Sequence, residues 1–112
     1  MAVSTIKGMK TGTFTPSSGV TIQETEIKQD GHNVYVRISA TRTGNFPTSQ
    51  QQVGNVSGVD LPKTLIRTIC GAGANAYGAT DSGYLLMDTD GGVYVQLPTA
   101  RPRVNICFTY IV

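Results

Sequence analysis

The chain has 112 residues, enough for one domain with a single core, and only 14% of them are charged. Its formal net charge of +2 is too weak, and its charges too scattered, to indicate binding to nucleic acid or to a membrane surface. The composition, with no tryptophan and with abundant glycine, threonine and valine, excludes a helical bundle and a disordered chain. No apolar run approaches ~20 residues, which excludes a membrane-spanning helix.

The N-terminal part of the chain predicts a lead-in, a turn and a strand. Residues 1–15 are polar with single apolar side chains, and we expect them to form a lead-in with one short strand at its end; they lack the apolar stretch of a signal peptide. The domain itself is then expected over residues 16–112, beginning with a Pro-Ser-Ser-Gly turn. A strand is predicted over residues 19–28, with a bulge between Ile22 and Ile27 because these two side chains are out of phase.

The clearest strand follows an Asp-Gly hairpin turn. Residues 34–41 alternate strictly between apolar and polar side chains, which is typical of an antiparallel sheet with one packed face. Residues 43–58 are polar and rich in glutamine, and we expect them to form a long loop that carries function or packs against a neighbour.

The second half of the chain is mostly strand in this interpretation. Four further strands are predicted over residues 65–70, 82–89, 93–97 and 103–112. The last strand has apolar side chains on both faces, including Cys107 and Ile111 on the more polar one. We therefore expect it to be covered on both sides, at the centre of a sheet or at a subunit interface.

The fold class follows from roughly seven or eight short strands joined by glycine, proline and aspartate turns. No stretch shows helical periodicity over ten residues. The sequence therefore predicts an all-β, antiparallel β-sandwich or jelly-roll-like fold.

Catalytic, metal and cofactor chemistry find little support in the residues. The one histidine, His32, is expected to be a solvated turn residue, and no Gly-x-Ser-x-Gly motif is present. Cys70 and Cys107 form no Cys-x-x-Cys motif and no Cys/His cluster, so no metal site is expected. We favour two buried free thiols over a disulfide, because nothing in the chain signals secretion. The glycine- and alanine-rich run at residues 71–76 lacks the Lys-Ser/Thr ending of a phosphate loop, so no cofactor is expected.

Acidic residues offer only a weak case for an enzyme. Asp88 and Asp90 flank a turn, where aspartate usually accepts hydrogen bonds from its own backbone. A polysaccharide-cleaving enzyme would have only Asp81 in addition to this pair. We therefore expect no enzyme activity.

Tyrosines indicate binding more strongly, because a flat apolar ring with a polar tip suits contact with sugars or proteins. Tyr35 and Tyr94 fall on the polar faces of their strands. The residues that we expect to bind a ligand lie in loops around the strand ends: Asn75, Tyr77, Asp81 and Arg101.

Four segments carry a resemblance to a known family. They are residues 28–36 (a charged turn and an alternating strand), 56–62 (leading into Leu-Pro), 84–95 (an Asp-Thr-Asp-Gly hairpin) and 105–111 (the terminal strand). In this order they resemble the C-terminal head domain of phage tail-fibre and baseplate receptor-binding proteins, over about four fifths of the chain. The sequence departs from the family pattern at residues 61–65, where a glycine, an aromatic residue and Arg-Pro are expected. The usual N-terminal shaft is not among these 112 residues, so we expect either an excised head or a small tip protein.

The resemblance implies a homotrimeric β-sandwich that recognises a saccharide on the bacterial cell surface. It also implies a place in the virion, at the tail tip, assembled in the host cytoplasm beside other tail or baseplate proteins, and it carries over no binding residue. Two other functions stay open: a structural tip or decoration subunit that docks on another tail protein through residues 49–52, and an enzyme that cleaves surface polysaccharide.

Overall fold

The computed structural model describes residues 9–74 and 81–112, and within them the chain is all-β and has no helix. The strands are β1 (Lys10–Thr11), β2 (Thr13–Pro16), β3 (Val20–Asp30), β4 (Asn33–Phe46), β5 (Gln51–Ser57), β6 (Ile66–Gly73), β7 (Asp81–Met87), β8 (Gly92–Gln96) and β9 (Arg101–Ile111). This confirms the predicted class, an antiparallel all-β fold. In this part of the chain there is also no helix of the length and apolarity needed to cross a membrane.

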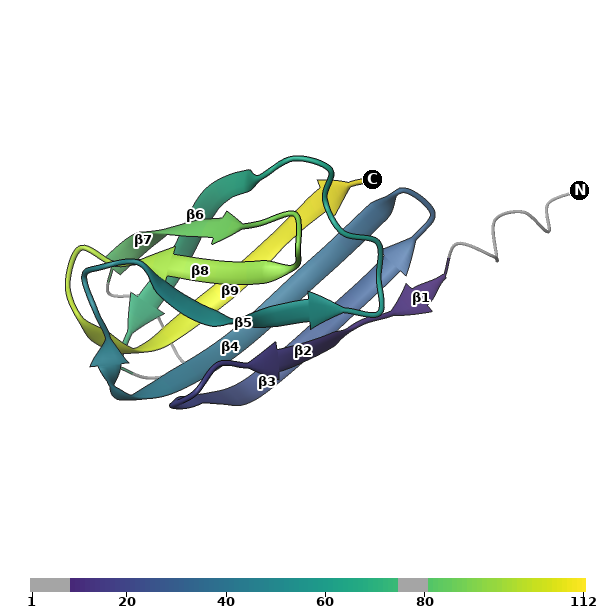
Figure 1. Ribbon diagram of the computed structural model, residues 1–112. Helices are drawn as coiled ribbons and strands as arrows, with labels where there is room; N and C mark the ends of the chain where they lie inside the picture. Colours follow the sequence, from purple (N-terminus) through teal and green to yellow (C-terminus); the bar gives the residue numbers. More distant parts are fainter. Residues whose placement is uncertain (1–8, 75–80) are drawn as a thin grey trace, which may run out of the picture.

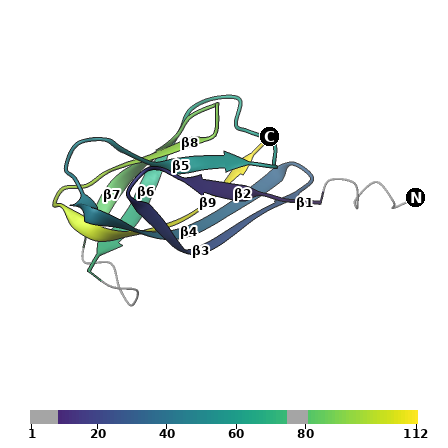
Figure 2. The same ribbon diagram turned by 60° about the horizontal axis from the view of Figure 1, so that its bottom comes forward.

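All nine strands belong to one antiparallel sheet, in the order β1-β3-β4-β9-β6-β7-β8-β5-β2 (Figure 1). The two ends of this order, β1 and β2, are consecutive in the chain and separated only by Gly12, so the sheet nearly closes into a barrel. Figure 2 shows this short stretch passing from β3 to β5. A side chain at Gly12 would crowd this crossing, because a Cβ there would lie 2.5 Å from the Cγ2 atom of Ile27.

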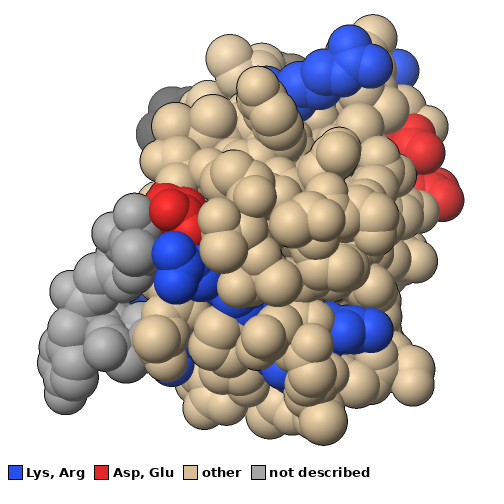
Figure 3. Space-filling view, turned by 90° about the vertical axis from the view of Figure 1, so that its left-hand side faces the viewer, with Lys and Arg blue, Asp and Glu red and all other residues tan. Residues whose placement is uncertain are grey.

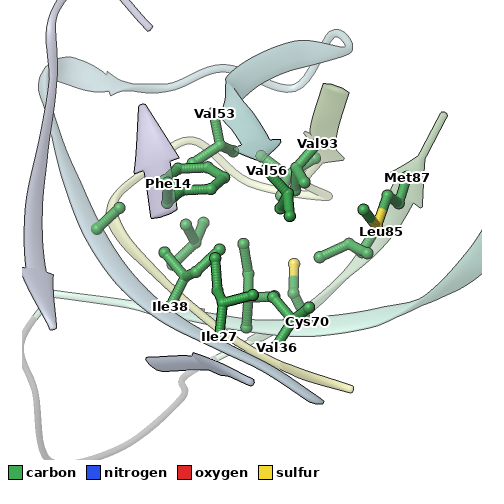
Figure 4. Close-up of a cluster of buried hydrophobic side chains, with 14 of the residues drawn as sticks. Phe14, Ile27, Val36, Ile38, Val53, Val56, Cys70, Leu85, Met87 and Val93 are labelled. Carbon is green, nitrogen blue, oxygen red and sulfur yellow. The ribbon is translucent and has the colours of Figure 1, made fainter. Parts of the chain in front are cut away.

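The barrel interior is filled by the alternating apolar side chains of its strands. Val36 and Ile38 from β4 point toward Phe14, Val53 and Val93 from the opposite wall (Figure 4). None of these five is more than 6% exposed. The alternation predicted for residues 34–41 is therefore the inner and outer face of β4.

One end of the barrel is closed by a polar cluster around the buried side chain of Gln29. Its Nε2 donates to the carboxylate of Asp60 and to the carbonyl oxygen of Gly31, both at 2.9 Å, and its Oε1 accepts from the backbone N–H of Asp60 at 2.8 Å. Lys10 pairs with the same carboxylate at 2.9 Å, and the Tyr110 hydroxyl donates to the Asp60 carbonyl oxygen at 2.7 Å. These bonds fix the loop between β5 and β6 to the barrel.

Some local predictions are confirmed and others are wrong. The bulge in β3 lies between Ile22 and Glu24, inside the predicted interval. The long loop expected over residues 43–58 is wrong, because β4 continues to Phe46 and Gln51–Ser57 forms β5, which pairs with β8. A second bulge in β5, between Gln52 and Gly54, hides its alternation in the sequence.

The last strand is central, as expected, but one of its faces is open. β9 lies between β4 and β6, whereas the outward side chains of Cys107 and Ile111 are exposed in the single chain, Ile111 by 75%. Both cysteines are free, and Cys70 is buried as predicted. The prediction that Cys107 is buried is wrong, because Cys107 pairs with Arg37 on the outer surface of the sheet.

Candidate functional site

The outer surface of β6, β7 and β8 exposes an aromatic and an aliphatic side chain in one row. Tyr84 is 73% exposed and Ile69 is 64% exposed, and the two residues pair directly across β6 and β7. Gln96 pairs with Tyr84 from the other side, on β8. Each faces outward because its strand neighbours, such as Leu85, are buried in the barrel.

A second row lies beside the first, two residues along each strand. Arg67 pairs with Leu86, and Leu86 pairs with Tyr94. Together the two rows form a surface that we call the Tyr84 face: Arg67, Ile69, Tyr84, Leu86, Tyr94 and Gln96.

Two hollows lie on this face and share Tyr84 and Gln96 as walls. The first, of about 300 Å³, also includes Gln50, Arg67 and Tyr94 in its lining. The second, of about 440 Å³, is the more apolar one and is lined by Ile69, Ser82, Gly83, Leu97 and Pro98 besides the shared walls. Tyr84 therefore stands between two concave surfaces of different polarity.

This arrangement offers groups that can bind a ligand. Tyrosine rings offer flat apolar surfaces, and the side chains of Gln50, Gln96 and Arg67 offer planar hydrogen-bonding groups. Neither lining contains an acid, a histidine or a cysteine, so neither holds a paired general acid and base or a nucleophile with its base. In the described ranges there is no group of His, Cys, Asp and Glu side chains that could hold a metal ion.

The residues predicted to bind a ligand lie elsewhere. Asp81 begins β7, Arg101 begins β9, and the Nε of Arg101 donates to the carboxylate of Asp81 at 2.7 Å. The structure thus brings these two together as an ion pair whose side chains are about a quarter exposed. Figure 3 views the end of the barrel at which β7 begins, where uncharged surface surrounds a few charged groups. The other two predicted residues, Asn75 and Tyr77, lie outside the described residues.

The tyrosines on polar strand faces have different surroundings. Tyr94 contributes to the first hollow, as does Gln50 from the glutamine-rich segment. Tyr35 is half-buried on the other side of the barrel, and its hydroxyl lies 3.8 Å from the Sγ of Cys107. The bond to Cys107 raises the pKa of Tyr35 above its ordinary value.

Turn residues behave as the sequence predicts. The ring Nδ1 of His32 lies 2.8 Å from the backbone oxygen of Val112, in an exposed turn. The carboxylate of Asp88 accepts from the N–H of Thr89, and that of Asp90 from the N–H of Gly92, both at 2.8 Å. These acids therefore cap their own turn.

Sequence reasoning missed the residue at the centre of the face. Tyr84 alternates with the buried Leu85 in a predicted strand, so its outward direction could have been read from the pattern. Its nearness to Arg67 and Ile69 depends on strand pairing, for which the sequence carries no signal.

Comparison with protein-family models, with curated proteins and with solved structures finds no match.

Proposed function

We propose that this chain is a carbohydrate-binding head domain of a phage tail tip, which attaches the virion to a saccharide on the bacterial surface. The observation that carries the proposal is Tyr84, 73% exposed between two hollows that planar polar groups line. A sugar ring presents a flat apolar face and a rim of hydroxyls. The ring of Tyr84 suits the face, and the amides of Gln50 and Gln96 suit the rim.

The support beneath the face favours a preformed site. Leu85 and Val95, which lie between outward residues on β7 and β8, are each 1% exposed in the core. Their packing holds the strands, and hence the outward side chains, in fixed places. A rigid site loses little conformational entropy when it binds.

The same proposal includes a sandwich-like form of the barrel and a homotrimer. The sheet has two short seams, two residue pairs between β1 and β3 and three between β6 and β9, which divide it into two walls. Beyond the seams the edges of β3 and β9 carry no ladder partner in the described chain, and a neighbouring subunit would cover such edges. In the virion, other tail or baseplate proteins would hold this trimer.

A structural role is the second candidate, and a specific observation favours it. Ile69 and Leu86 add aliphatic surface to the Tyr84 face, and exposed apolar residues beside tyrosine and arginine are typical of protein interfaces. In this alternative the chain docks on another tail protein and binds no sugar.

The test compares Tyr84→Ala with two control variants on a glycan array and on cell-wall polysaccharides purified from bacterial strains. We expect Tyr84→Ala to weaken binding at least tenfold, as truncation at the centre of an interface does. Tyr84→Phe keeps the ring and should retain most of the affinity, and Tyr35→Ala removes a tyrosine outside the face. Circular dichroism verifies that each variant is folded.

The outcomes separate the candidates. Unchanged binding by a folded Tyr84→Ala variant would refute the placement of the site. Failure of the wild type to bind any polysaccharide, together with tight binding to a purified tail protein, would favour the structural role. Light scattering tests the trimer independently, since the solution mass should be three times that of one chain.

A further inference from the structure

We infer that the saccharide bound by the Tyr84 face is acidic and that Arg67 pairs with its negative group. This inference rests on the proposed function and makes it more specific. Its starting point is the first hollow, where Arg67 is the one charged residue in the lining. The remaining lining consists of glutamines, a threonine, tyrosines and aliphatic side chains.

Arg67 has no ion-pair partner among the described residues. Arg37 pairs with two glutamates on β3, and Arg101 pairs with Asp81. Arg42 and Arg103 also form no ion pair among the described residues, but they lie outside the lining of the first hollow. The pairing of β6 with β7 places Arg67 beside Leu86, which offers no charge. A guanidinium without a partner, in a concave and partly apolar surface, is a site for an external anion.

The two acids that follow β7 in the chain already accept hydrogen bonds. Asp88 and Asp90 follow β7 directly, and each carboxylate accepts a backbone hydrogen bond within its own turn at 2.8 Å. Both bonds hold the carboxylates at the turn. The positive charge of Arg67 is therefore available to a ligand in the first hollow.

The strand geometry places Arg67 and Tyr84 close enough together to contact one ligand. Arg67 and Tyr84 lie on adjacent strands, two residues apart in register. Strand rise and spacing then put their Cα atoms about 8 Å apart. A ring stacked on Tyr84 would therefore carry its own acidic group, or that of the neighbouring unit, to the guanidinium. Two chemistries fit, a carboxylate of a uronic acid and a phosphodiester.

The experiment uses cell-wall polysaccharide from a strain that the wild-type protein binds, separated on an anion exchanger into neutral and acidic fractions. We expect binding to the acidic fraction only, weakening when sodium chloride is raised from about 50 to about 500 mM. Arg67→Gln should lose at least tenfold in affinity for this fraction, and Arg67→Lys should lose less. Lys28→Gln is the matched control, because it removes one positive charge from β3 on the other side of the barrel.

Chemical treatment of the acidic fraction distinguishes the two anions. Carbodiimide activation followed by borohydride reduction converts uronic acids to neutral sugars, and hydrofluoric acid cleaves phosphodiesters. Loss of binding after one treatment identifies the group that Arg67 recognises.

Failure of this inference is distinguishable from failure of the proposed function. Equal binding to both fractions, or unchanged affinity of Arg67→Gln, overturns the acidic ligand. If Tyr84→Ala still abolishes binding in that case, the proposed function stands with a neutral sugar. If the wild type binds the polysaccharide of no strain, both fall.

Discussion

The buried amide of Gln29 should be a main contributor to the stability of the barrel end. Gln29 is 2% exposed and makes three hydrogen bonds, two to Asp60 and one to the carbonyl oxygen of Gly31. Each such bond contributes about 1 kcal/mol net, so Gln29→Met should lower the free energy of unfolding by about 2–3 kcal/mol. Methionine keeps the volume of the side chain, and the loss is therefore assigned to hydrogen bonding.

Urea unfolding followed by circular dichroism measures this loss, with the slope of the transition unchanged. Gln23→Ala is the matched control on the same strand, because Gln23 is exposed and makes one side-chain hydrogen bond, to Thr41. We expect a change below about 0.5 kcal/mol there. A near-neutral Gln29→Met beside a costly Gln29→Ala would refute the reasoning, since it would assign the effect to a cavity.

Three further predictions concern charge, backbone and thiols. Hydrogen bonds from Lys10 and Gln29 lower the pKa of the Asp60 carboxyl from its ordinary value of 3.8. The carboxylate therefore stabilises the fold fully above pH 3.8, and this contribution is lost as the pH falls through the lowered pKa. Unfolding curves of Asp60→Asn should lack this acid dependence. Gly91→Ala should lower the free energy of unfolding in urea by at least about 2 kcal/mol, because the φ of Gly91 is 93° and a Cβ there would lie 2.5 Å from the carbonyl oxygen of Val56. Gly19→Ala should cost about 1 kcal/mol, because Gly19 has a similar φ of 81° but open space around it. A thiol reagent should modify Cys107 in the folded chain and Cys70 only after unfolding, because burial raises the pKa of Cys70 to about 11; equal rates for both would contradict the buried position.

Local pattern predicts the strands of this fold better than their assembly. The strict alternation of residues 34–41 identifies the two faces of β4, and the phase change between Ile22 and Ile27 identifies the bulge in β3. β5 was not predicted because its two buried apolar side chains, Val53 and Val56, are three positions apart, a spacing that a regular strand does not produce. The bulge that makes both point inward is stabilised by pairing with β8, which is a tertiary effect.

The candidate site shows the same limit more sharply. Alternation assigns Tyr84 and Tyr94 to outer faces, but only the pairing of β7 with β8 sets them in neighbouring rows. The prediction favours loops because loops carry function most often. Two of the four expected residues, Asp81 and Arg101, form an ion pair with each other. Outward side chains on paired strands give no composition signal of their own.

The Tyr84 face is also the place where the sequence departs from what stability requires. The barrel is complete without an exposed tyrosine and isoleucine, because the core is closed by inward residues such as Leu85 and Val95. Polar residues such as threonine on the outer face of β6 and β7 would satisfy the sheet and lower the risk of aggregation. Instead Ile69 and Tyr84 stand next to each other with more than 60% of their surface in water. Such apolar exposure does not stabilise the isolated chain, and for this reason we place the proposed ligand on this face.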